Sequence, residues 1–163
     1  ADALGARLVA VDLGPGFAQA VEDHRAIWTA ELAHELRHLH ERGREAMSAE
    51  LLALIDHGRA LGAQRYLDAR LARVRYREAL AALLEEHDAI LTPAAPGEAP
   101  LGLEATGSPA FCTLWTLTGL PALSLPILTG PNGLPLGCQL VGGPGEDARL
   151  LSVAHWLLGQ VGS

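Results

Sequence analysis

The hydrophobic pattern of the chain changes at Asp88, and this change limits the folds open to it. Before Asp88, apolar residues recur at helical spacing, which predicts helices over 17–40, 48–58 and 64–86. After Asp88, short apolar runs are broken by glycine and proline, which is typical of strands joined by tight turns. We therefore expect an α/β fold in which a helical segment is followed by a strand-rich one.

The elements expected around this change can be placed by residue number. Asn132-Gly133 separates two apolar runs and predicts the turn of an antiparallel hairpin. The third helix is expected to bury Leu67, Leu71, Val74, Leu80, Leu83 and Leu84. The remaining predictions are strands at 7–13, 89–92, 122–128 and 136–141, and helices at 109–118 and 146–160. A length of 163 residues suits a single domain, 1–163, composed of segments 1–87 and 88–163.

Charge and composition exclude several classes of partner. The formal net charge is −7, so neither nucleic acid nor a membrane is an expected partner, because both favour clustered cations. All 12 basic residues are arginines, and the sequence contains no lysine. Cys112 and Cys138 lie in apolar surroundings and outside any metal-binding spacing, which predicts buried, reduced thiols and a cytoplasmic location, with a disulfide as the alternative.

The stretch from His34 to His38 reads HELRH and matches the spacing of a zinc-hydrolase helix. In such a helix both imidazoles bind the metal and the glutamate activates its water. On a helical projection centred on Leu36, however, both histidines face away from the apolar side. No third ligand follows at a suitable spacing, so we expect a fortuitous surface match and no metal site.

Three runs in the second half, with the helices before them, resemble the amidase signature family. They are DAILTPAAP from Asp88, TGSPAFCTLWTLTGLPALSLP from Thr106, and NGLPLGCQLVGGPGEDARLLSVAHWL from Asn132. Their order is similar to that of the C-terminal part of a bacterial amidase. The resemblance implies the C-terminal portion of an α/β/α sandwich, with helices packed on a partial mixed sheet.

The same resemblance implies a hydrolase of carbon–nitrogen amide bonds that uses no cofactor. Family members activate a nucleophilic serine through a second serine, in a cis peptide, and a lysine base, a logic that any weak hydroxyl nucleophile requires. This sequence has no lysine and five serines, none adjacent to another, so no catalytic residue is assigned and the chain alone is expected to be inactive. By analogy with the family's substrate cleft, Phe111, Cys112, Trp115 and Thr118 are candidate substrate-binding residues, with core packing as the alternative for Phe111 and Trp115.

The expected partners are a small-molecule amide substrate, the missing N-terminal part of the amidase and, as a possibility, further copies of the chain. Thr116 stands where the family often has asparagine, and Pro109 where some glutamine-handling members have a more polar residue. These differences favour a general amidase over a component of a transamidating complex. Two alternatives remain open: an assembly module that completes a split amidase, and a zinc hydrolase built on HELRH.

Overall fold

The computed structural model describes residues 5–161 and divides into two compact units. One unit contains the chain up to Phe17 together with everything from Arg77 onward, and the other contains residues 18–76. The boundary at Tyr76/Arg77 falls inside a continuous helix, α4 (Ala63–Glu85), so each unit is described separately below. No helix within residues 5–161 has both the length and the apolar character needed to cross a bilayer.

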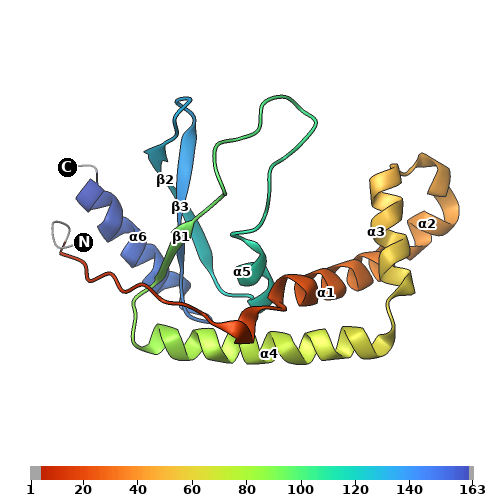
Figure 1. Ribbon diagram of the computed structural model, residues 1–163, viewed down its shortest axis with the longest axis horizontal. Helices are drawn as coiled ribbons and strands as arrows, with labels where there is room; N and C mark the ends of the chain where they lie inside the picture. Colours follow the sequence, from red (N-terminus) through yellow and green to blue (C-terminus); the bar gives the residue numbers. More distant parts are fainter. Residues whose placement is uncertain (1–4, 162–163) are drawn as a thin grey trace. The chain divides into compact units, whose positions relative to one another are not determined.

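The unit formed by residues 18–76 is helical, and its centre is a close crossing of two helices (Figure 1). Its elements are α1 (Ala20–Glu35), α2 (Arg37–Gly43), the short 3-10 helix η3 (Arg44–Ala46), α3 (Ala49–Ala60) and the first part of α4. Helix α3 begins after Ser48, whose hydroxyl oxygen accepts a hydrogen bond from the Leu51 amide at 3.2 Å. At the crossing, Gly58 of α3 lies against the backbone of Thr29 in α1. A side chain at position 58 would separate the two helices.

A buried carboxylate links α1 to α4 within this unit. Asp23 is 5% exposed and accepts hydrogen bonds from Arg65 at 2.6 Å and from the Tyr76 hydroxyl at 2.7 Å. Burial, together with the hydrogen bond to Asp23, raises the pKa of Tyr76 from 10.0 to about 12. The charge of Asp23 is thus matched by a cation and a hydroxyl, as a buried carboxylate requires.

The single helix predicted over 17–40 is wrong in its continuity. Residues Pro15–Phe17 form the 3-10 helix η2, and α1 stops at Glu35 before α2 restarts at Arg37. Leu36 adopts φ −88° and ψ 5°, outside the helical region, and the Arg37 guanidinium donates to the His34 carbonyl at 2.8 Å. A side chain thus takes one of the carbonyls at the end of α1, which the spacing of apolar residues could not reveal.

The buried face of α4 also differs from the prediction in its first half. Leu67, Leu71 and Val74 are 53%, 62% and 52% exposed, whereas Leu80 and Leu84 are buried. In the first half the buried positions belong to Ala69, Ala72 and Tyr76. Small alanines allow close helix approach, so this face of α4 is set by fit rather than by apolar size.

The second unit contains a three-stranded antiparallel sheet in the order β1-β3-β2. The strands are β1 (Ile90–Pro93), β2 (Ala122–Thr129) and β3 (Pro135–Val141). The predicted hairpin is confirmed by the pairing of β2 with β3, and Gly133 has the positive φ (82°) that its turn requires. Pro126 lies on an edge strand where the register shifts between Leu125 and Leu128, as a residue without an amide hydrogen demands.

The long loop after β1 is fixed to the tip of this hairpin. Glu98 accepts hydrogen bonds from the Asn132 amide at 2.9 Å, the Asn132 side chain at 2.6 Å and the Leu134 amide at 3.1 Å. One carboxylate therefore holds the loop and the turn together.

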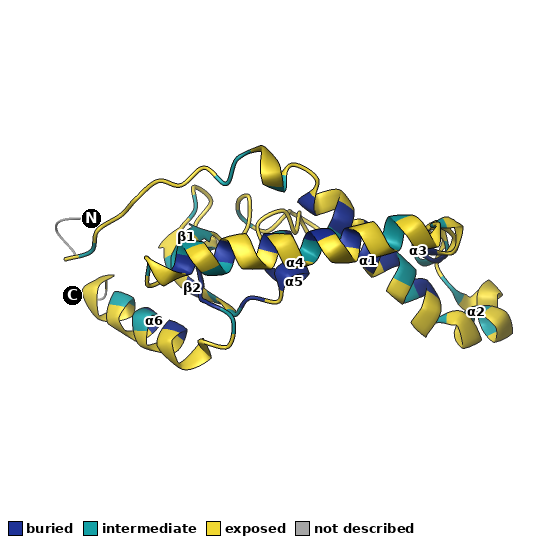
Figure 2. Ribbon diagram, turned by 90° about the horizontal axis from the view of Figure 1, so that it is seen from below, coloured by how far each residue is buried: buried dark blue, intermediate teal, exposed yellow. Residues whose placement is uncertain are grey.

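Helices cover both faces of the sheet, which confirms the α/β class (Figure 1). Side chains alternate along a strand, so Leu140 and Val141 of β3 enter different cores. Leu140 packs with Leu150 and Ala154 of α6 (Asp147–Val161). Val141 packs with Leu84 of α4 and with Trp115 of α5 (Thr113–Thr118). Figure 2 shows the buried residues of α6 on one side of that helix, with the opposite side exposed.

The strand predicted at 7–13 is not present. Within the described residues this segment has no regular secondary structure, although Leu13 packs against the core around Leu80 and Trp115. Leu8, Val9 and Val11 are 64%, 48% and 47% exposed. An apolar run forms a strand only where another strand supplies hydrogen-bonding partners, and no strand in the described part of the chain pairs with it.

Candidate functional site

Helix α5 and the turn after it build one wall of the candidate site. The Pro109 carbonyl accepts hydrogen bonds from the amides of Cys112 and Thr113, which starts the helix. Gly119 ends it with φ 67°, and its amide returns to the Trp115 carbonyl at 2.8 Å. The Pro121 carbonyl then accepts the Gly142 amide at 2.9 Å, which ties the turn to the end of β3. Glycine and proline in the TGLP run therefore serve to fix the backbone.

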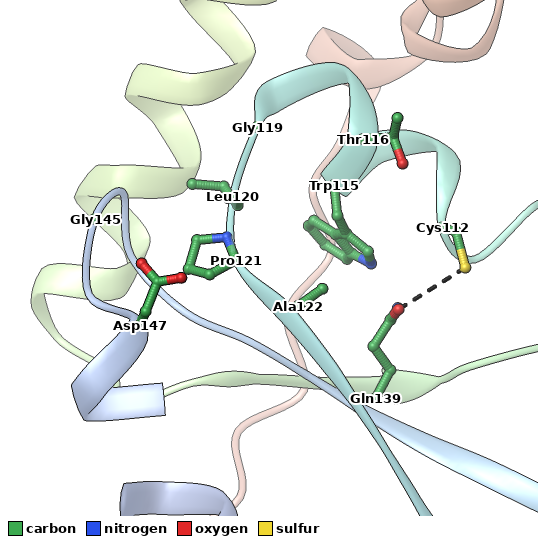
Figure 3. A pocket seen from close by; sticks show the side chains of 10 residues that line it. All are labelled: Cys112, Trp115, Thr116, Gly119, Leu120, Pro121, Ala122, Gln139, Gly145 and Asp147. Carbon is green, nitrogen blue, oxygen red and sulfur yellow. Dashed lines mark hydrogen bonds between the residues drawn. The ribbon is translucent and has the colours of Figure 1, made fainter. Parts of the chain in front are cut away.

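This wall borders an open cavity of about 430 Å³ (Figure 3). The polar groups around it come from separate elements: α5, the strand β3 and the start of α6. The lining includes Cys112, Trp115, Thr116, Pro121, Gln139 and Asp147.

The four predicted substrate-binding residues lie in different surroundings. Cys112 and Trp115 line this cavity, whereas Phe111 lines a second cavity of about 610 Å³ between β1, the end of α4 and residues 7–13, which Trp115 also borders. Thr118 is fully buried, and its hydroxyl donates to the Leu114 carbonyl at 2.8 Å, so its side chain is held within its own helix. Their role in substrate binding stays a prediction.

Gln139 is a polar residue of this site that the sequence analysis missed. It is 5% exposed, and its side-chain amide nitrogen donates to the Phe111 carbonyl at 2.9 Å and to the Thr92 hydroxyl at 3.2 Å. Its carbonyl oxygen lies 3.9 Å from the Cys112 sulfur, the contact drawn in Figure 3. A signal was present: with a period of two, Gln139 shares the face of Val141, so a polar side chain points towards a helix layer.

Trp115 supplies a donor without an acceptor. Its side chain is 7% exposed, and no atom of residues 5–161 accepts a hydrogen bond from its indole nitrogen Nε1. Figure 3 shows this nitrogen on the edge of the ring that faces Gln139 and Cys112. A buried polar group normally has a partner, so this one marks a position where a ligand atom would be stabilised.

The charge around the cavity is sparse. Asp147 is the ionisable carboxylate in its lining, and no arginine of residues 5–161 borders it. Cys112 is exposed, contrary to the prediction of a buried thiol, because the loop before α5 leaves its sulfur at the surface. Cys138 is half-buried, and burial raises the pKa of its thiol. The site therefore presents mainly neutral hydrogen-bonding groups.

The HELRH stretch lies in the other unit and is divided between two helices. His34 lies in α1 and His38 in α2, on either side of Leu36, and both are exposed as the helical projection indicates. Residues 5–161 contain no group of three histidine, cysteine, aspartate or glutamate side chains placed to hold a metal. The geometry of a zinc-hydrolase helix is not formed.

Comparison with known sequences and structures identifies the relatives of this chain. The amidase family model matches residues 3–151. A glutamyl-tRNA(Gln) amidotransferase component from Cereibacter sphaeroides is 45% identical over 78 residues, covering 43% of this chain and 16% of the relative. The amidotransferase component of the same name from Helicobacter pylori is 38% identical over 98 residues, covering 56% of this chain and 22% of the relative.

Solved structures show the same relationship. A crystal structure of an amidase matches with a TM-score of 0.78 and 29% identity, covering 86% of this chain and 35% of that one. An s-triazine catabolic enzyme matches with a TM-score of 0.82 over 98% of this chain and 37% of that one, at 23% identity, and shows the shared fold. The chain thus spans little more than a third of these enzymes. The match to the family model over most of its length shows that the chain belongs to the amidase signature family.

Proposed function

We propose that these 163 residues form the C-terminal part of a general carbon–nitrogen amide hydrolase and supply one wall of its substrate cleft. The observation that carries the proposal is the cavity between α5, β3 and α6 in a chain that belongs to an amide-cleaving family. The related proteins carry the names of an amidotransferase and of amidases, so amide hydrolysis and amide transfer share the required chemistry. Within the described residues the cavity lining contains no cation that would hold the carboxylate of a glutamine substrate, which supports a general amidase.

The nucleophile and its base are proposed to come from residues outside this sequence. A serine hydroxyl needs a base to remove its proton, and the family's base is a lysine, which this sequence lacks. The five serines are separated from one another, and Ser124 in β2 and Ser152 in α6 belong to different layers. The chain accordingly acts as scaffold and substrate wall, in a protein that we place in the cytoplasm.

A test is to measure ammonia release from butyramide by the chain alone and by a chimera. In the chimera, the chain replaces the matching third of the crystallised amidase that it resembles. We expect no turnover by the chain and measurable turnover by the chimera, with the truncated amidase lacking any graft as the control. Ammonia release by the chain alone in a chelator would contradict the division of labour, and an inactive but folded chimera would contradict the scaffold role.

A second candidate function is an assembly module that completes the fold of a separate partner. The observation in its favour is that both β1 and β2 are edge strands of the three-stranded sheet. Edge strands offer unpaired backbone groups to another chain. Co-purification of the chain with a separately encoded serine- and lysine-containing amidase segment would favour this form of assembly.

A further inference from the structure

We infer that Trp115 and Gln139 together recognise a neutral carboxamide or urea group, with Trp115 donating to its carbonyl oxygen and Gln139 accepting from its N–H. The inference rests on the proposed function, because it names the chemical group that the amidase cavity would take. Trp115 contributes the indole N–H that lacks an acceptor in residues 5–161, and Gln139 contributes a carbonyl oxygen. A carboxamide presents the complementary pair of groups side by side.

The orientation of Gln139 is fixed by its own hydrogen bonds. A glutamine amide has two N–H donors, and here the donors serve the Phe111 carbonyl and the Thr92 hydroxyl. The opposite side of the group, the carbonyl oxygen, is left with only a long contact to the Cys112 sulfur at 3.9 Å within the described chain. A thiol is a weak donor, so this oxygen keeps its capacity to accept a stronger N–H.

The electrostatics of the cavity favour a neutral group over a carboxylate. A carboxylate has no N–H to offer Gln139, and Asp147 in the lining would repel its charge. No arginine among residues 5–161 lines the cavity to compensate for that repulsion. A site built to bond an N–H rejects an analogue that lacks it, because the carbonyl of Gln139 would then lose its partner.

The test is a titration of the 163-residue chain with butyramide and, separately, with sodium butyrate, two ligands of the same carbon skeleton. Nuclear magnetic resonance of isotopically labelled indole nitrogens reports directly on Trp115, and the signal is assigned by its loss in Trp115→Phe. Trp156→Phe is the matched control, because Trp156 lies in α6 and is 41% exposed. The backbone amides of Thr116 and Ala122 report independently on occupancy of the cavity.

We expect butyramide to shift the Trp115 indole proton and the two backbone signals together, and butyrate to leave them unchanged. Trp115→Phe should weaken butyramide binding about fivefold, the effect of one hydrogen bond, while Trp156→Phe leaves the affinity unchanged. Equal shifts with butyrate, or backbone shifts without movement of the indole proton, would overturn the inference and leave the cavity as an amide site. No shift at any cavity residue with saturating butyramide would overturn the proposed amide site itself. The wild-type indole signal gives this answer even if Trp115→Phe does not fold.

Discussion

Replacing Gly58 by alanine is expected to destabilise the helical unit, although alanine is the better helix former. A Cβ at this position would collide with the Thr29 carbonyl oxygen and lie 2.5 Å from its carbon and 3.0 Å from the Ala33 side chain. The obstacle is backbone, so α1 and α3 must separate. Overpacking of this kind costs about 1–3 kcal/mol or more, against about 1 kcal/mol gained in helix propensity. We expect a net loss of about 2 kcal/mol.

The matched control is the same substitution at Gly159, which lies inside α6 with nothing within 4 Å of the added carbon. There the propensity gain acts alone, and Gly159→Ala should stabilise the protein by about 0.5 kcal/mol, since the helix end contributes less than the full value. Urea unfolding followed by circular dichroism measures both free energies of unfolding. Opposite signs are the expected result. Stabilisation by Gly58→Ala would show that the α1–α3 crossing is wrongly placed.

Three further predictions concern charged and ionisable groups. Asp23→Ala should cost about 3 kcal/mol because it removes a buried acceptor shared by Arg65 and Tyr76, whereas Asp56→Ala, at an exposed ion pair, should cost far less; equal losses in urea would contradict this. The pKa of Tyr76 is raised to about 12 when folded, so its stabilisation is complete below pH 10 and is lost as the pH rises towards 12, which pH-dependent unfolding will detect. Burial opposes ionisation of Glu98, but hydrogen bonds from Asn132 and Leu134 outweigh it and lower its pKa; Glu98→Gln should therefore speed hydrogen exchange of the Asn132 amide, and protonation at a pH below the folded pKa should do the same in the wild type, while unchanged exchange would refute the anchor.

The local elements of the second half could be predicted because their signals are local. The Asn132-Gly133 pair set the hairpin, although only Gly133 of the two has a positive φ. Gly119 ended α5 as a left-handed cap, and Pro126 interrupted an edge strand. Each of these residues restricts its own backbone dihedrals, so its effect survives in any tertiary context.

Predictions that depended on a distant partner failed. Residues 7–13 have an apolar run suited to a strand, but strand formation needs a neighbouring chain segment to pair with. The buried face of α4 was assigned to its leucines, whereas the packing selected Ala69 and Ala72. Helical spacing identifies a candidate face, and the shape of the neighbouring helix decides which face is buried.

The candidate site illustrates the same limit in chemical terms. Trp115 could be singled out because it belongs to the run that resembles a family cleft, yet its unpaired N–H within residues 5–161 is a property of the folded surroundings. Gln139 could be found only once the register of β3 against β1 places it opposite Thr92, where one end of its amide is held and the other is free. The donor and the acceptor lie on different elements, α5 and β3, so neither motif alone specifies a carboxamide. Their combination does, because each group supplies the hydrogen-bonding function that the other lacks.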